Sequence, residues 1–178
     1  MAASECPNYG KRTREYSMDD IEEFYKRLHF GDIIVIERTL YNHWVVYVQN
    51  ETFGRAGVEG DHLVVHINGN SYLGSYSSGN GNAAVVEPLI DVVGNSKFYI
   101  NNEYDFDESP NPPSFIQIRL ENELECLRKE YNLFNYNCEH FATLIRNNKP
   151  KSVQLDDKAI IIGIGSALVG AWNFLFFK

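Results

Sequence analysis

The sequence predicts an α+β fold in which an antiparallel β-sheet packs against helices. Three observations favour this class. Runs rich in β-branched and aromatic residues dominate the chain up to about residue 101, apolar residues at helical spacing follow them, and no internal repeat is visible. Strands that precede the helices, rather than alternating with them, are typical of α+β proteins. A length of 178 residues suits one domain with its own core.

The first expected element is a short helix. Residues 1–16 are polar and are expected to be flexible. Ser17, followed three residues later by Asp20, has the pattern of a capping box, and Gly31 is a suitable end for the helix. Between these signals, apolar side chains recur at helical spacing: Ile21, Phe24 and Leu28.

Five segments are predicted as strands because Val, Ile, Tyr, Phe and Trp are concentrated in them. They are residues 31–38, 41–50, 62–68, 83–93 and 97–101.

Two helices are predicted after the strands. The first begins at Ser114 and runs to about Tyr131, and the second begins near Cys138 and ends near Asn147. Residues 68–82 are rich in Gly, Ser and Asn, and we interpret them as a flexible loop. A phosphate-binding loop is disfavoured because neither a Lys-Ser/Thr pair nor a helix follows.

The last part of the chain has a different composition. Residues 159–177 carry no charged side chain, and a helix of this length just crosses a hydrocarbon core of about 30 Å. A helix buried in the core is the alternative interpretation. Lysine is more frequent before this segment than after it, which predicts that the preceding domain faces the cytosol from an intracellular membrane. The expected division is a flexible N-terminus at 1–16, a main domain at 17–148, a linker at 149–158 and a single-pass anchor at 159–178.

Composition excludes several classes of protein. A net charge of -8 and a pI of about 5.1 disfavour binding to nucleic acid, so any membrane contact has to come from apolar burial. Three cysteines without a CxxC pair indicate neither a disulfide framework nor a zinc ribbon, and they favour a reducing compartment. The first residues contain no apolar stretch, so we expect no secretory signal peptide.

Cys138 is the candidate nucleophile. Asn137 is a good helix cap, which places Cys138 at the first helical position. The unpaired N–H groups and positive field of a helix start favour the thiolate, and the Cys138 backbone N–H can donate to a developing oxyanion. An inert buried cysteine is the alternative, and Cys6 and Cys126 are interpreted in that way.

Histidines on two predicted strands supply a candidate base. His43 shares a strand face with Val45, and His62 and His66 share a face of the next strand. A thiol, an imidazole base and a second, orienting imidazole form a nucleophile–base–orienter set. Spacing alone leaves buried structural histidines and, less favoured, a zinc site open as alternatives.

Five segments resemble the lecithin:retinol acyltransferase-like family, in particular its phospholipase A and acyltransferase branch. They are GDIIVI, YNHWVVYV, LVVHI, NNEYDFDESPNPPSFIQIRL and NYNCEHF. The resemblance implies a circularly permuted NlpC/P60 (papain-like) fold and a reaction that needs neither cofactor nor metal.

The resemblance also implies roles for individual residues. Cys138 is then the nucleophile, His43 the general base and acid, and His66 the residue that orients His43. Tyr41 is a candidate for binding the oxyanion or the substrate. The two histidines are closer in sequence in the family, whereas 22 residues lie between them here, so His62 is a substitute candidate for His66. His140 belongs to the motif and is expected to be structural.

The function implied is a cysteine-dependent phospholipase A1/A2 and acyltransferase. The acyl group would pass from a glycerophospholipid through a Cys thioester to water, to the amine of phosphatidylethanolamine or to a lysophospholipid. The expected partners are phospholipid substrates and a membrane, with no nucleic acid, and the sequence identifies no protein partner. A retinol-type acyltransferase, an NlpC/P60-type cysteine peptidase or amidase, and a non-enzymatic tail-anchored adaptor are the alternatives.

Overall fold

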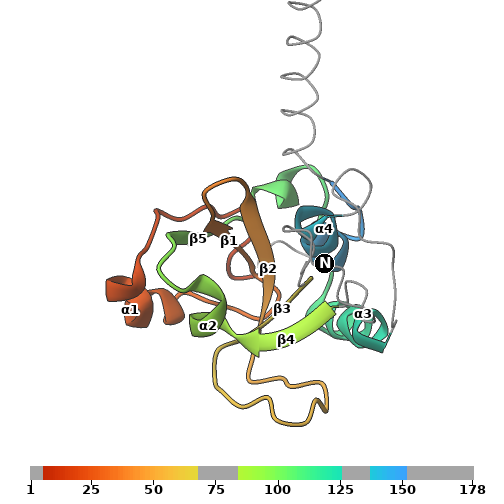
Figure 1. The fold of residues 1–178 in the computed structure, drawn as a ribbon. Helices are drawn as coiled ribbons and strands as arrows, with labels where there is room; N and C mark the ends of the chain where they lie inside the picture. The colour runs from red at the N-terminus through yellow and green to blue at the C-terminus, as the bar shows by residue number, and fades with distance from the viewer. Residues whose placement is uncertain (1–5, 68–83, 126–136, 152–178) are drawn as a thin grey trace, which may run out of the picture.

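A five-stranded antiparallel sheet forms the centre of the domain, as Figure 1 shows for a computed structural model. The structure describes residues 6–67, 84–125 and 137–151. The strands are β1 (Ile33–Glu37), β2 (Asn42–Gln49), β3 (Leu63–Ile67), β4 (Ala84–Pro88) and β5 (Phe98–Ile100), in the order β4-β3-β2-β1-β5. The helices are η2 (Met18–Asp20), α1 (Ile21–Tyr25), α2 (Leu89–Val93), η3 (Glu103–Phe106), α3 (Pro113–Glu125) and α4 (Cys138–Asn147). The predicted α+β class is confirmed.

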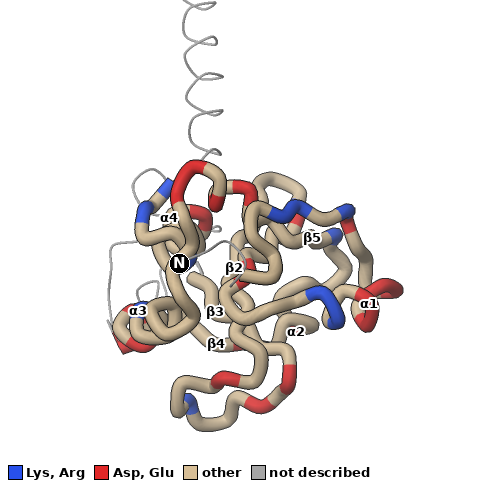
Figure 2. The backbone as a smooth tube through the Cα atoms, turned by 180° about the vertical axis from the view of Figure 1, so that it is seen from behind, with Lys and Arg blue, Asp and Glu red and all other residues tan. Residues whose placement is uncertain are grey.

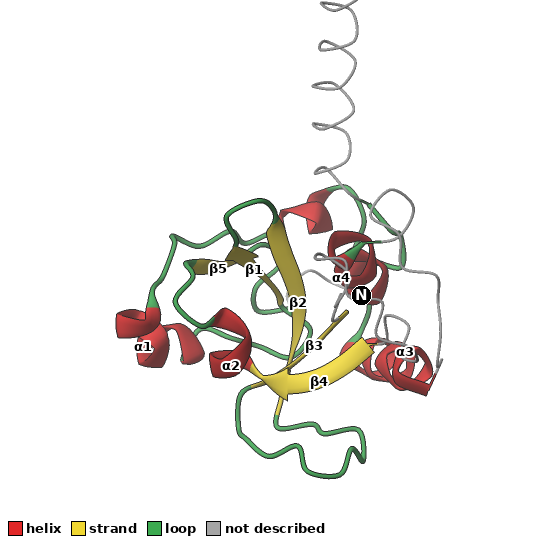
Figure 3. Ribbon diagram, viewed as in Figure 1, coloured by secondary structure: helices red, strands yellow, loops and turns green. Residues whose placement is uncertain are grey.

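Apolar cores lie on both faces of the sheet. Successive residues of a strand point to opposite faces, so Val45 and Tyr47 join one core while Val46 and Val48 join the other. Helices α1 and α2 cover the first face, and α3 and α4 cover the second (Figure 3). Because β1, β2 and β3 are buried between these layers, charged residues lie mostly outside them (Figure 2).

A buried ion-pair network fixes α4 to the sheet. The Arg146 guanidinium is 1 % exposed and donates to Asp105 at 2.7 and 2.8 Å and to the carbonyl oxygen of Gly31 at 2.8 Å. Asn147 also donates to Asp105, at 2.8 Å. These bonds tie the end of α4 to η3 and to the segment just before β1. The other end of α4, where Cys138 lies, is therefore held in one position against the sheet.

One predicted element is wrong in part. The segment 83–93 was expected to be a single strand, but the strand ends at Pro88 and Leu89–Val93 form a helix. Proline has no N–H to donate to a sheet. After it, the buried residues Leu89, Val92 and Val93 follow helical spacing, and a continuous apolar run hides this difference in period.

Other predicted elements are shorter than expected or lie outside the description. The helix expected after Ser17 is one 3-10 turn followed by one α-helical turn that ends at Tyr25. The loop 68–82, the part of the 114–131 helix beyond Glu125, and the anchor at 159–178 lie outside the described residues. Within the described ranges, no helix combines the length and the apolar character that a membrane crossing requires.

Candidate active site

Cys138 is the first residue of α4, and a reciprocal cap sets its position. The Asn137 side chain accepts the N–H of His140 at 3.0 Å, and the His140 ring accepts the N–H of Asn137 at 3.2 Å. The His140 imidazole therefore stabilises the start of the helix, in line with the structural role expected for it.

The Cys138 sulfur is buried against the backbone of β2. The side chain is 4 % exposed, and its thiol donates to the carbonyl oxygen of Asn42 at 3.6 Å. The backbone N–H groups of Trp44, Glu139 and Cys138 also interact with the sulfur. Asn42 and Trp44 flank His43 in the sequence, so the sulfur lies beside the backbone from which that imidazole projects.

Burial raises the pKa of the Cys138 thiol to about 11. The surrounding N–H groups lower the pKa, as expected for a helix start, but the loss of solvation has the larger effect. The predicted preference for a resting thiolate is therefore wrong for this structure. A buried neutral thiol needs a base to take its proton during attack.

His43 and His66 form a hydrogen-bonded pair that continues to Glu87. His43 Nε2 lies 3.0 Å from His66 Nδ1, and His66 Nε2 lies 2.8 Å from Glu87 Oε2. Residues 66 and 87 are diagonal neighbours on one face of the β3–β4 pair, in which His66 is opposite Val85.

The hydrogen bonds indicate which ring nitrogens carry protons. The hydrogen bond to His66 lowers the pKa of Glu87, so this carboxylate accepts the N–H of His66 Nε2. His66 Nδ1 then accepts from His43 Nε2, which leaves His43 Nδ1 with a lone pair. Burial first, and then the electrostatic interactions with His66 and Arg38, lower the pKa of His43 to about 3. His43 is therefore neutral and able to accept a proton at physiological pH.

The other two candidate residues differ in position. Tyr41 lies edge-on to His43, with ring centroids 6.4 Å apart. His62 is not in the pair: its Nδ1 lies 2.8 Å from the Tyr47 hydroxyl, and its ring stacks on Tyr25 at 3.6 Å. The structure thus brings His66, and not the substitute His62, to His43.

A comparison with models of protein families finds a match over most of the domain. The family model described as Lecithin retinol acyltransferase matches residues 26–151, which is more than half of the chain. The chain belongs to this family. The matched range contains the five strands that the structure describes, helix α4, and the residues Cys138, His43 and His66.

The chain is also similar to proteins that are named as phospholipases A and acyltransferases. Phospholipase A and acyltransferase 3 of Mus musculus is 34% identical over 154 residues, which cover 79% of this chain and 85% of the relative. Phospholipase A and acyltransferase 4 of Homo sapiens is 33% identical over 145 residues, which cover 78% and 81%. Phospholipase A and acyltransferase 2 of Homo sapiens is 32% identical over 152 residues, which cover 82% and 86%.

Glu87 is a residue of the site that was not predicted from the sequence. The signal was a single carboxylate in an otherwise apolar strand, AVVEP. A half-buried charge in such a strand requires a partner, and the neighbouring strand carries a histidine. In the described part of the chain, no group of three or more His, Cys, Asp or Glu side chains has the arrangement of a metal site.

The raised pKa of the Cys138 thiol predicts how this residue reacts with iodoacetamide. Alkylation is expected to be slow at neutral pH and to rise about tenfold per pH unit toward pH 11, because only the thiolate is nucleophilic. Peptide mass spectrometry measures the rate, with the partly exposed Cys6 as a reference thiol in the same sample. A rate that is already constant from mildly acidic pH would instead indicate a resting thiolate–imidazolium pair.

Proposed function

We propose that this chain is a cysteine-dependent phospholipase A1/A2 and acyltransferase. The names of its relatives support the reaction class. The observation that carries the proposal is the buried Cys138 thiol on the backbone beside His43, whose imidazole belongs to a chain that ends at Glu87. This set contains a nucleophile, a neutral base and groups that orient the base.

The reaction begins when His43 Nδ1 takes the thiol proton as the Cys138 sulfur attacks an ester carbonyl of the phospholipid. The backbone N–H groups at Cys138 and Glu139 are the donors assigned to the oxyanion, with the Tyr41 hydroxyl as an additional candidate. Glu87 and His66 hold His43 in the required tautomer, and the Glu87 carboxylate partly offsets the charge of the imidazolium that forms.

Collapse of the tetrahedral intermediate completes the first half-reaction. The ester C–O bond breaks, His43 returns its proton to the leaving alkoxide, and a lysophospholipid departs from the acyl-thioester. In the second half, His43 removes a proton from water, from the amine of phosphatidylethanolamine or from the hydroxyl of a lysophospholipid. Attack on the thioester carbonyl then restores the Cys138 thiol, with no metal or cofactor in the sequence of steps.

The proposal extends to topology and location. In the chain, the strands that carry the histidines precede the helix that carries Cys138, an order that supports a circularly permuted NlpC/P60 fold. The uncharged segment 159–177 supports a single-pass anchor that holds the domain on the cytosolic face of an intracellular membrane.

A substrate panel tests the proposal. The purified full chain is incubated with labelled phosphatidylcholine, with and without phosphatidylethanolamine, and in parallel with retinol as acceptor and with a peptide panel. We expect lysophosphatidylcholine and free fatty acid, and N-acyl-phosphatidylethanolamine when the amine is present. Peptide cleavage without lipid turnover would support the NlpC/P60-type peptidase instead.

Glu87 is expected to contribute through His66. Glu87→Ala should lower kcat on phosphatidylcholine about 10- to 100-fold with KM nearly unchanged, because a hydrogen bond to a charged group contributes about 1.5–3 kcal/mol. The Glu87 side chain is 42% exposed, so the lower end of this range is the better expectation. Glu87→Asp should recover part of the loss.

A matched control separates this role from folding. Glu121 is an exposed glutamate on α3, and Glu121→Ala should leave kcat and the melting temperature unchanged. An unaltered kcat in Glu87→Ala, or a loss explained by unfolding at the assay temperature, would contradict the positioning role.

A further inference from the structure

The chain folds back on α4 directly after that helix ends. Asn148 has a left-handed backbone conformation, with a φ of 63°, and this conformation ends the helix and turns the chain. The backbone N–H of Lys151 then donates to the Thr143 hydroxyl oxygen at 2.9 Å, and this hydroxyl donates to the carbonyl oxygen of Glu139 at 2.9 Å. Glu139 follows Cys138 in the sequence, so residues 148–151 are fastened to the part of α4 that carries the proposed nucleophile.

Lys151 also contacts η3. Its ammonium group pairs with Asp107 at 2.8 Å and lies 4.4 Å from the centre of the Tyr104 ring. The uncharged segment begins eight residues further along, at position 159. An extended chain covers at most about 3.3–3.6 Å per residue, so this segment starts within about 29 Å of Lys151 whatever conformation lies between them. A membrane crossing by residues 159–177, as proposed above, therefore keeps η3 near the surface of the bilayer.

Two large apolar side chains are exposed at the same end of the domain. Phe106 on η3 is 70 % exposed, and Leu40 in the turn between β1 and β2 is 79 % exposed. Figures 1 and 2 show η3 and this turn, from opposite sides, at the upper end of the domain. Exposed apolar side chains next to the point where the chain leaves for an uncharged segment are suited to contact with lipid.

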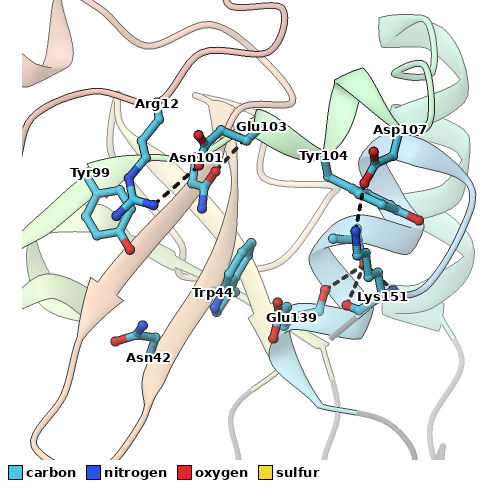
Figure 4. Close-up of a pocket in the computed structure, with 11 residues that line it drawn as sticks. Arg12, Asn42, Trp44, Tyr99, Asn101, Glu103, Tyr104, Asp107, Glu139 and Lys151 are labelled. Atoms are coloured by element: carbon cyan, nitrogen blue, oxygen red, sulfur yellow. Dashed lines mark hydrogen bonds and ion pairs between the residues drawn. The ribbon is translucent and has the colours of Figure 1, made fainter. Parts of the chain in front are cut away.

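A pocket of about 440 Å³ joins these elements to the active site. It is lined by Tyr104 and Lys151 and by Asn42, whose carbonyl oxygen accepts from the reactive thiol at 3.6 Å. Figure 4 shows Lys151 on one side of this pocket and Asn42 on the other. Phe106 lies two residues after Tyr104, and Leu40 lies two residues before Asn42. The exposed apolar residues and the approach to the thiol thus share one end of the domain.

The charges around η3 are matched in sign. Three cation–carboxylate pairs lie there: Arg12–Glu103, Lys149–Glu108 and Lys151–Asp107. These pairs carry no net charge, and the net charge of the whole chain is -8, so this surface has no electrostatic attraction for anionic lipid. A zwitterionic lipid surface that is contacted by apolar side chains fits both observations.

We propose that this end of the domain docks on a zwitterionic phospholipid bilayer, a step that rests on the function proposed above. The Phe106 and Leu40 side chains insert among the lipids, and the pocket faces the bilayer. The contacts of Lys151 with α4 and η3 fix the point at which the chain leaves the domain, so the docked surface and the proposed anchor lie on the same side. Docking lets an ester in the bilayer approach Cys138 in one orientation of the domain.

The first test compares an ester held in a bilayer with an ester dissolved in water. The full chain is reconstituted in vesicles of a dialkyl-ether phosphatidylcholine, which has no ester bond to cleave. Dioleoylphosphatidylcholine in these vesicles is one substrate, and dihexanoylphosphatidylcholine dissolved as monomers is the other. The ratio of kcat/KM for the bilayer substrate to that for the dissolved substrate is expected to fall about five- to tenfold in Phe106→Ser and in Leu40→Ser, because each variant loses the burial of one large apolar side chain.

Phe115→Ser is the matched control for both variants. Phe115 is 58 % exposed on α3, which lies away from η3 and the β1–β2 turn in Figure 1. The ratio of the two activities should therefore stay unchanged in this variant.

A second readout does not depend on turnover. Phe106→Trp and Phe115→Trp each add one fluorophore to the two native tryptophans. The emission that each variant adds to that of the unmodified chain is measured in vesicles of brominated phosphatidylcholine, which quenches tryptophans in contact with its acyl chains. We expect the emission added at position 106 to be quenched and that added at position 115 to persist.

The outcomes separate docking from the proposed function. Equal quenching at positions 106 and 115, or an unchanged activity ratio in both Phe106→Ser and Leu40→Ser, overturns the docked surface. A full chain that cleaves neither ester overturns the proposed function, while quenching confined to position 106 would still support the docked surface.

Discussion

Cys138→Ala is expected to abolish phospholipid turnover, with kcat lowered by about 10⁴-fold or more. The sulfur is the atom that becomes acylated in the proposed reaction, and the other thiol in the described ranges, Cys6, contacts Arg146 instead. Cys138→Ser should be nearly as inactive, because a buried hydroxyl is a far weaker nucleophile than a thiol with the same base. Release of labelled fatty acid from phosphatidylcholine measures the loss.

Two controls accompany this prediction. Cys138→Ala removes one small atom from a packed site, so a circular dichroism melt should show a folded domain. Cys6→Ser is the matched control, since Cys6 contacts Arg146 at the other end of α4 and is not among the groups at the active site. Substantial turnover in a folded Cys138→Ala protein would exclude the covalent mechanism.

His43→Ala is expected to lower kcat by about 10³-fold, within the 10²–10⁴ range that general acid–base catalysis contributes. The neutral thiol, with its pKa raised to about 11, depends on His43 for deprotonation. His66→Ala should have a smaller effect, because His66 acts on the reaction only through its 3.0 Å contact with His43.

His62→Ala provides the comparison for both variants. His62 lies one residue before β3, the strand that carries His66, but bonds to the Tyr47 hydroxyl and stacks on Tyr25. We expect kcat in His62→Ala to remain close to that of the unmodified chain. A loss as large as that of His66→Ala would mean that His62 also orients the base.

Much of the fold follows from local sequence patterns. The strands 33–37, 42–49 and 63–67 were predictable because β-branched and aromatic residues mark them over several residues. The helix at Leu89–Val93 was not, since an apolar run of this length is compatible with either period until Pro88 is recognised as a strand end.

The site was predictable only in part, because some of its properties depend on contacts between separate elements. Cap chemistry and motif resemblance located Cys138, His43 and His66 in the sequence. The contact of His66 with Glu87 depends on the register between two strands, which single-residue patterns do not report. The raised pKa of Cys138 depends on burial by α4 and β2, so the helix-start argument alone predicted the wrong protonation state.

The arrangement of the two cores explains how such distant segments meet. Helix α4 packs on the face of β2 that carries Val46, whereas His43 follows the face of Val45 and Tyr47. The sulfur contacts the backbone of Asn42 and Trp44, the residues on either side of His43 in the sequence. At the other end of α4, the buried hydrogen bonds of Arg146 hold the helix in the position that this contact requires.

Intact-protein mass spectrometry after brief exposure to phosphatidylcholine and an acid quench tests the central claim most directly. The account predicts a mass gain of one fatty acyl group that maps to the peptide containing Cys138 and is removed by hydroxylamine. Rapid release of fatty acid with no trapped acyl group on Cys138, or with the acyl group on another residue, would contradict a thioester at this sulfur.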